Sequence, residues 1–168
     1  MKLSQIAMAT LLASGIAFGA QAAGNTGTVT FSGEVVDSPC DLAAGQDGAD
    51  IKVDFGQLSV AGLNGGRVAT KNFEIKLKNC VIDKKTAAIT FTSTDQIAGK
   101  NLLKTNGDAT GLGIKLNNIT FGTALELNGL ANGDQTLTYI AGVQKADEAT
   151  DVTAGAFTAS ANFEIAYK

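Results

Sequence analysis

Hydrophobic and polar residues alternate with a period of two over most of the chain, whereas helical periodicity is hard to find. The alternating runs are rich in β-branched and aromatic residues, which is typical of half-buried strands. They centre on residues 29–35, 73–80, 89–92, 114–116, 125–127 and 137–141. Asn-Gly and Asp-Gly pairs, which favour tight turns, occur at 47–48, 64–65, 106–107, 128–129 and 132–133. This spacing predicts an all-β fold, built as an antiparallel β-sandwich.

The longest alternation lies at the C-terminus, over residues 157–167. One parity is apolar throughout and consists of Phe157, Ala159, Ala161, Phe163, Ile165 and Tyr167. Five of these eleven positions belong to the other parity, which is mostly polar. The pattern predicts one long strand with a single buried face. Taken alone, such a run is typical of an ordinary core strand at the centre of a sandwich.

A second unusual run lies near the N-terminus, where residues 24–33 carry no charge and contain three glycines. One face of the run comprises Gly27, Val29, Phe31, Gly33 and Val35. A strand with glycine at two of five such positions packs poorly by itself. It suits a segment that is extended and is later pressed closely against another backbone. The alternative is a conventional first strand of the sandwich.

The first residues have the pattern of an export signal. Lys2 provides a positive charge, residues 3–18 are uncharged and largely apolar, and Ala20-Gln21-Ala22 has the small-x-small form of a cleavage site. The apolar stretch is shorter than the about 20 residues that a membrane span needs. We expect cleavage after Ala22, with an uncleaved N-terminal anchor as the alternative.

Export decides how the two cysteines are interpreted. In an oxidising compartment two thiols most simply form one disulfide, here between Cys40 and Cys80. Closing a loop of about 40 residues stabilises a fold by roughly 4 kcal/mol in the chain-entropy treatment. A reactive thiol pair is the alternative, but this separation is unlike that of a CxxC redox motif.

Composition excludes several classes of function. The 168 residues include no His, and 13 basic side chains stand against 16 acidic ones, for a net charge of −3. Without His, the chain has no Ser-His-Asp triad, Cys-His pair or HExxH zinc helix, and two Cys cannot complete the usual structural zinc site. The acidic balance argues against binding to nucleic acid. We therefore expect no enzyme activity, no cofactor, no metal and no small-molecule substrate.

Together these features resemble the chaperone–usher pilins, the structural subunits of type 1 and P-type fimbriae. The resemblance rests on the signal-like start and on residues 27–40, 73–80, 111–114 and 155–167. In that family a Gly fourteen residues from the C-terminus and a penultimate aromatic residue mark the last strand, and Gly155 and Tyr167 occupy these positions here. Many members have Pro-Gly before that strand, whereas this chain has Ala154-Gly155.

The resemblance implies an incomplete immunoglobulin-like β-sandwich that a donor strand from another subunit completes. A periplasmic chaperone would first lend the strand, and at the outer-membrane usher the N-terminal extension of the next subunit would replace it. The implied donor-strand residues are Gly27, Val29, Phe31, Gly33 and Val35. The implied chaperone or groove strand comprises Gly155, Phe157, Ala159, Ala161, Phe163, Ile165, Tyr167 and Lys168, whose terminal carboxylate the chaperone would hold.

The implied organisation is a signal peptide over 1–22, a donor-strand extension over 23–34 and a pilin domain over 35–168. The implied function is that of a structural subunit, exported through the periplasm of a Gram-negative bacterium. It would polymerise with other copies, or with paralogous pilins, into a surface fibre used in adhesion. A major shaft subunit is favoured. The alternatives are a minor adaptor or terminator and a tip adhesin, although the family's adhesins carry an additional lectin domain and lack a donor extension.

Overall fold

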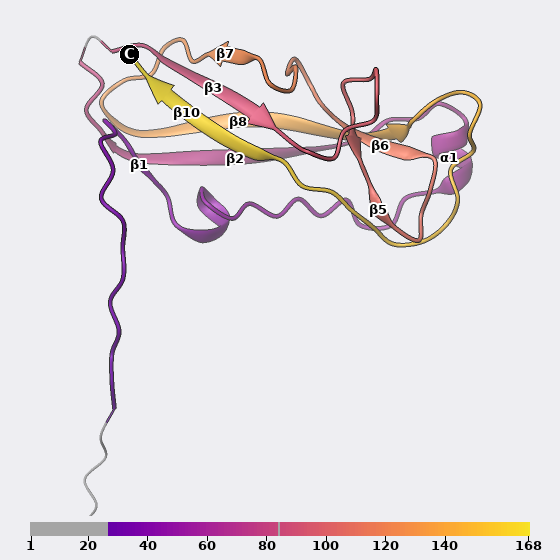
Figure 1. Ribbon diagram of the computed structural model, residues 1–168, viewed down its shortest axis with the longest axis horizontal. Coiled ribbons are helices and arrows are strands. Elements are labelled where there is room, and N and C mark those ends of the chain that lie inside the picture. The colour runs from indigo at the N-terminus through magenta and orange to yellow at the C-terminus, as the bar shows by residue number, and fades with distance from the viewer. Residues whose placement is uncertain (1–26, 84) are drawn as a thin grey trace, which may run out of the picture. The chain divides into compact units, whose positions relative to one another are not determined.

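The computed structural model describes residues 27–83 and 85–168, and the chain divides between Val35 and Val36 into two units. The expected signal peptide and its cleavage site lie outside the described residues. In the first unit, residues 27–35 are extended, exposed and without regular secondary structure (Figure 1). The predicted strand over 29–35 is therefore not formed in this chain. None of the described helices is long and apolar enough to cross a membrane.

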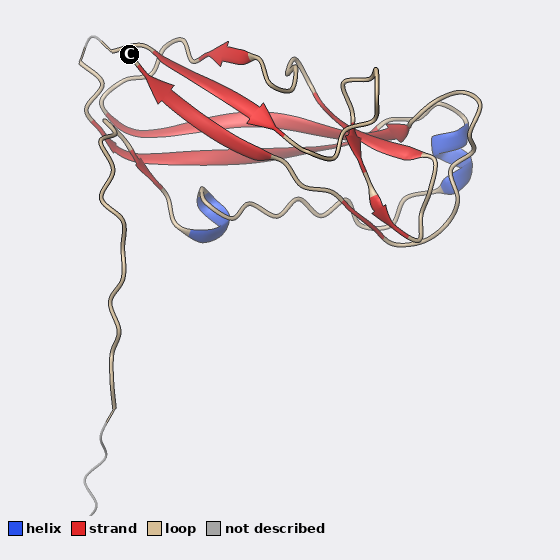
Figure 2. Ribbon diagram, in the orientation of Figure 1, coloured by secondary structure: helices blue, strands red, loops and turns tan. Residues whose placement is uncertain are grey.

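The second unit consists almost entirely of β-structure, which confirms the predicted all-β class (Figure 2). Its strands are β1 (Asp41–Leu42), β2 (Ala69–Cys80), β3 (Ala87–Thr92), β4 (Leu103–Lys104), β5 (Asn106–Gly107), β6 (Leu112–Leu116), β7 (Ala124–Glu126), β8 (Gly133–Lys145), β9 (Phe157–Thr158) and β10 (Asn162–Tyr167). Two short helices, η1 (Gly45–Asp47) and α1 (Val60–Asn64), lie between β1 and β2.

Two antiparallel sheets form the body of this unit. One has the strand order β1-β2-β8-β6-β4 and the other the order β10-β3-β7, while β5 and β9 pair separately. The inward faces of both sheets contribute to one core, in which Ile75 of β2, Ile89 of β3 and Val143 of β8 are completely buried. Along the long strands β2 and β8 and along β3, alternate side chains thus point inward, as the period of two predicted.

The C-terminal strand differs from the prediction in its continuity. The structure has two strands, β9 and β10, separated by residues 159–161, in place of one strand over 157–167. The backbone changes partner at this break, because β9 pairs with β5 whereas β10 pairs with β3. The predicted burial of one face is nevertheless confirmed, since every second residue from Phe157 to Tyr167 is half-buried and packs against the core.

Two of the predicted hairpin turns are not formed. Asn64-Gly65 ends helix α1, whose first turn is capped by the Ser59 hydroxyl oxygen as it accepts a hydrogen bond from the Gly62 N–H (3.2 Å). Asn106-Gly107 forms strand β5 itself. By contrast, Asn128-Gly129 does lie in a turn, between β7 and β8. The dipeptide alone therefore marks a local change of direction without specifying a hairpin.

The predicted disulfide is confirmed. Cys40 and Cys80 are bonded, and both are buried, at 4% and 2% exposure. The bond joins the residue that precedes β1 to the last residue of β2, where the paired register of β2 and β8 shifts. It therefore fixes the beginning of the second unit against its longest sheet pairing.

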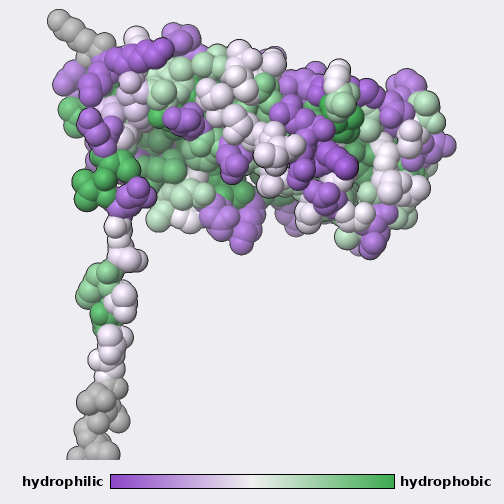
Figure 3. Space-filling model, in the orientation of Figure 1, coloured by the Kyte–Doolittle hydropathy of each residue, from purple (hydrophilic) through white to green (hydrophobic). Residues whose placement is uncertain are grey.

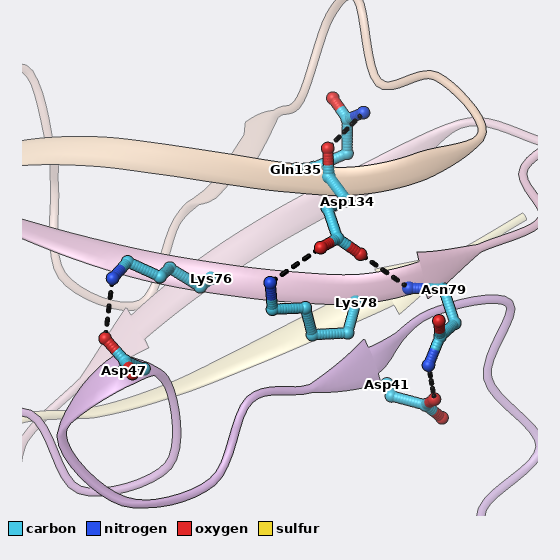
Figure 4. A network of polar contacts seen from close by, with 7 residues as sticks. All are labelled: Asp41, Asp47, Lys76, Lys78, Asn79, Asp134 and Gln135. Atoms are coloured by element: carbon cyan, nitrogen blue, oxygen red, sulfur yellow. Dashed lines mark hydrogen bonds and ion pairs between the residues drawn. The ribbon is translucent and has the colours of Figure 1, made fainter.

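A network of polar contacts covers the outer face of β2 (Figure 4). Lys76 pairs with Asp47 of η1, and Lys78 pairs with Asp134 of β8, each with a nitrogen–oxygen distance of 2.6 Å. The Asn79 backbone N–H also donates to Asp134 (3.2 Å). The hydrogen bond from Lys76 lowers the pKa of Asp47, and those from Lys78 and Asn79 lower the pKa of Asp134.

This network makes the unfolding free energy depend on pH at the acid end. The pKa of Asp134 is lower in the folded than in the unfolded protein, so its carboxylate stabilises the fold above the unfolded value of about 4. This contribution is lost as pH falls through the lower folded value. We predict that Asp134→Asn flattens the decline in stability between about pH 5 and pH 2, measured by urea unfolding at a series of pH values.

The partner variant Lys78→Met provides the matched comparison, because it removes the ammonium group and leaves the carboxylate in place. It should flatten the acid decline as well, and the double variant should add little further change. An Asp134→Asn protein whose stability declines as steeply as that of the unmodified chain would contradict this assignment.

Candidate functional site: an open groove along strand β10

Strand β10 is hydrogen-bonded along one edge only. All six of its residues pair with β3, from Asn162 opposite Thr92 to Tyr167 opposite Ala87. The ladder extends to the end of the chain, where Thr86 and Lys168 exchange two backbone hydrogen bonds of 2.9 and 2.8 Å. On its other edge β10 pairs with no strand of the described chain. The opposite sheet likewise ends at β1, so that both sheets are open on this side.

A groove of about 510 Å³ lies beside the break between β9 and β10. Its floor is apolar and comes from both sheets, being formed by Phe73, Phe91, Leu103, Ile114, Leu116 and Ala141. One wall is the 157–163 segment, including Phe157 and Phe163. The other wall is residues 49–55, called the lip below. The groove is therefore a gap in the sandwich that is open to solvent and lined by core residues.

A second hollow continues the groove along the rest of β10. It is lined by Val36, Leu42 and Leu77 on one side and by Phe163, Ile165 and Tyr167 on the other. Phe163 lines both hollows, so that the two form one continuous channel beside the unpaired edge. The chain thus brings together five of the predicted groove residues, Phe157, Ala159, Ala161, Phe163 and Ile165, with Tyr167 at the far end.

The lip has the periodicity of a strand without being one. Ile51, Val53 and Phe55 are half-buried, whereas the alternating Lys52 and Asp54 are exposed. Within the described chain, no strand pairs with this segment. Its apolar alternation is visible in the sequence and is the signal that marks it as a segment with one inward face.

A compact turn around η1 holds the lip in place. The backbone N–H of Ala49 donates to the Ala43 carbonyl (3.0 Å), and that of Lys52 donates to the Gln46 side chain (3.0 Å). Gly48 lies so close to Ala43 that a Cβ at this position would be 2.3 Å from the Ala43 carbonyl oxygen. The glycine is therefore required for the turn that leads into the lip.

An aromatic cluster supports the groove floor. The Phe91 ring lies 6.4 Å from that of Phe73, 5.2 Å from that of Tyr139 and 6.1 Å from that of Phe163, measured between ring centroids. Phe91 is almost completely buried, whereas Phe73 and Phe163 are half-buried and line the groove. Burial raises the pKa of Tyr139 to about 12, because a phenolate would be poorly solvated at this half-buried position. The cluster joins β10 and β3 to strands β2 and β8 of the opposite sheet through close aromatic contacts.

Gly155 and Lys168 occupy different surroundings from the other predicted groove residues. Gly155 has a φ of +153°, and a Cβ there would be 2.5 Å from the backbone nitrogen of Ala109. It allows the turn that enters β9 but does not line the groove. Lys168 lies at the end of the β10 ladder, beyond the channel.

The polar side chains that line the groove, among them Asp50, Lys52 and Ser160, are exposed at its rim. No polar or charged residue is buried in the described part of the chain. Residues 27–83 and 85–168 also contain no cluster of three or more His, Cys, Asp or Glu that could hold a metal ion. What the groove presents is apolar side chains beside an unpaired backbone edge, which suits the addition of an extended segment.

The described part of the N-terminal unit presents apolar side chains to solvent. Val29 is 74% exposed, Phe31 is 89% exposed and Val35 is fully exposed. Figure 3 shows this segment as apolar residues among weakly polar ones. Among the described residues, nothing lies within 4 Å of a Cβ built on Gly27 or Gly33, so contacts in this part of the chain do not require either glycine.

Comparison with known proteins gives one consistent family. The family model described as fimbrial protein matches residues 29–168. Fimbria A protein of Serratia marcescens is 39% identical over the whole of both chains. The PRS fimbrial major pilin protein of Escherichia coli is 37% identical, over 84% of this chain and 94% of the relative.

Solved structures agree with the sequence relatives. A chaperone–usher pilus, solved to explain rod uncoiling, matches 86% of this chain and 96% of its own with 36% identity and a TM-score of 0.75. The P pilus rod subunit PapA matches 78% of this chain and all of its own with 34% identity and a TM-score of 0.69. Their fold confirms the expected incomplete immunoglobulin-like sandwich. The chain therefore belongs to the fimbrial protein family, a family of structural pilins that are not enzymes.

Proposed function

We propose that this protein is the shaft subunit of a chaperone–usher fimbria, and that its groove receives the N-terminal extension of the next copy. The proposal is carried by the unpaired edge of β10, which lies beside a continuous apolar channel. A further strand at this edge would pair with the free backbone N–H and C=O groups and cover the exposed core side chains. Relatives named as major pilins and a rod subunit support a shaft subunit over a tip adhesin.

The extension has the features that an added strand needs. Val29, Phe31 and Val35 share one parity and are exposed, so they are available to fill the groove. Burying each side chain contributes about 1.5–3 kcal/mol, and backbone hydrogen bonds to β10 add to this. The absence of charge over residues 24–33 also fits, because an unpaired charge buried in the groove would be strongly unfavourable.

Gly33 would leave one inward position of the added strand without a side chain. Among the described residues nothing lies near its Cβ position. The lack of a side chain would therefore matter only where this segment packs against another subunit. A glycine in the middle of an added strand allows the two backbones and the groove floor to approach closely. The extension would thus combine two anchoring regions, at Val29–Phe31 and at Val35, with a slim segment between them.

Before assembly, the same groove would need temporary cover in the periplasm. A pilus chaperone would lend a strand to β10 and hold the carboxylate of Lys168, and the outer-membrane usher would direct its replacement. Export would remove residues 1–22, leave 23–34 as the extension and fold 35–168 as the pilin domain. The division of the chain between Val35 and Val36 lies one residue from this proposed domain boundary.

Deleting residues 23–34 provides a direct test of the proposed donor strand. The shortened chain should still bind the chaperone, because its own groove is intact, but should not extend a fibre. Chaperone co-purification and electron microscopy of cells that express only this variant measure the two steps. Fibres of normal length from the deletion variant would show that the extension is not the donor strand.

A pair of neighbouring substitutions tests the parity of the donor strand. We predict that Gly33→Arg stops polymerisation, because a long charged side chain would be forced into the groove. Ser32→Arg adds the same side chain on the opposite parity and should still form fibres. Polymer length can be measured in a reconstituted assembly reaction with chaperone-bound subunits. Equal polymerisation of the two variants would remove Gly33 from the groove.

A further inference from the structure

The four Asn-Gly pairs of the chain lie in four different environments, and these decide their chemical reactivity. In such a pair the backbone nitrogen of the glycine can lose its proton to water and attack Cγ of the asparagine side chain. Ammonia leaves and a five-membered succinimide forms. Water then opens the ring at either carbonyl, giving aspartate or isoaspartate. The reaction requires a free asparagine side chain and a glycine nitrogen that can approach it.

Asn64 is held at both reacting groups. Its side-chain nitrogen donates to the Val152 carbonyl (3.2 Å), and its side-chain oxygen accepts from the Val152 N–H (2.8 Å). The N–H of Gly65, which would supply the attacking nitrogen, donates to the Ala61 carbonyl at the end of α1 (2.9 Å). Reaction at Asn64 would therefore require this part of the fold to open first.

The pairs at Asn106 and Asn132, which lie in or next to strands, are also restrained. The Asn132 side-chain oxygen accepts a hydrogen bond from the Ile82 N–H (2.8 Å), and Gly133 begins β8 opposite Cys80. Asn106 is paired with Thr158 in the β5–β9 ladder. A Cβ on Gly107 would be 2.3 Å from the Ala156 carbonyl oxygen, so the backbone around this pair is tightly packed.

Asn128 differs from the other three in that its pair lies outside every strand and helix. Asn128 and Gly129 are exposed in the turn between β7 and β8, and Gly129 has a φ of +86°. Within residues 27–83 and 85–168, no hydrogen bond holds the Asn128 side chain or the Gly129 nitrogen. We propose that Asn128 is a modification site, at which the folded protein deamidates spontaneously.

The modification would alter the subunit without blocking its groove. It replaces a neutral amide by a carboxylate and so adds one negative charge to the β7–β8 turn. Neither Asn128 nor Gly129 lines the channel beside β10. In the isoaspartate form the backbone passes through the former side chain, which lengthens the turn between Leu127 and Leu130, two half-buried residues that pack against the core. The fraction of converted subunits would therefore increase with the age of the protein.

The test compares the same four sites in the folded and the unfolded protein. The full chain is incubated in folded form at mildly alkaline pH, and a second sample is incubated in denaturant at the same pH. Digestion and mass spectrometry then follow the conversion of each asparagine. In the folded sample, Asn128 should convert at least about tenfold faster than the other three sites, a ratio equivalent to about 1.4 kcal/mol of opening free energy. In denaturant the four rates should converge.

The variant Asn128→Gln is the matched control, because its longer amide closes a less favourable six-membered ring. It should remove most of the early conversion of the folded protein and leave the other three sites unchanged. Folded protein in which Asn64, Asn106 or Asn132 converts as fast as Asn128 would overturn the proposal. So would conversion of Asn128 that is much slower in the folded than in the unfolded chain. Neither result depends on whether the protein forms fibres.

Discussion

The unpaired edge of strand β10 is the constraint on which the rest of this structure depends. A strand edge leaves a row of N–H and C=O groups without partners, and natural proteins usually protect such an edge. Here one edge of β10 is fully paired with β3, while the other borders a groove lined by residues such as Phe73 that are only half-buried. One more strand would pair with this edge and would also fill the apolar channel beside it.

Three parts of the scaffold keep this gap in a defined form. The Cys40–Cys80 bond fixes the beginning of the unit to the end of β2. The turn around η1 is tied to β2 through the Lys76–Asp47 pair. It holds the lip in place as the groove wall that faces the 157–163 segment. The aromatic contacts of Phe91 join β10 and β3 to the opposite sheet. A donor strand would therefore meet walls that are already in position, which reduces the conformational entropy lost on binding.

The sequence predicted those features that depend on local periodicity or on a single pairing. The alternation from Phe157 to Tyr167 predicted the correct buried face, and a chain with two cysteines offered one simple disulfide. The break at residues 159–161 was not predictable in this way, because it arises where the backbone changes from β5 to β3 as its partner. Asn64-Gly65 was misassigned because a short capped helix uses the same residues as a turn.

The N-terminal extension shows a different limit of sequence analysis. Its alternation is that of a strand, yet residues 27–35 form none in the single chain. A strand is stabilised by its neighbours, so a segment whose partner belongs to another molecule retains the pattern without the structure. Periodicity therefore identified the segment, but only the open groove indicates what it would pair with.

Hydrogen exchange of a self-complemented chain tests the central claim most directly. Residues 24–35 are attached after Lys168 through a flexible linker, and backbone amide exchange is compared with that of the same chain carrying a scrambled segment. If the extension completes the sandwich, amides of β10 and of the lip at 51–55 become strongly protected only in the chain with the native segment. Equal exchange of these amides in the two chains would contradict the account.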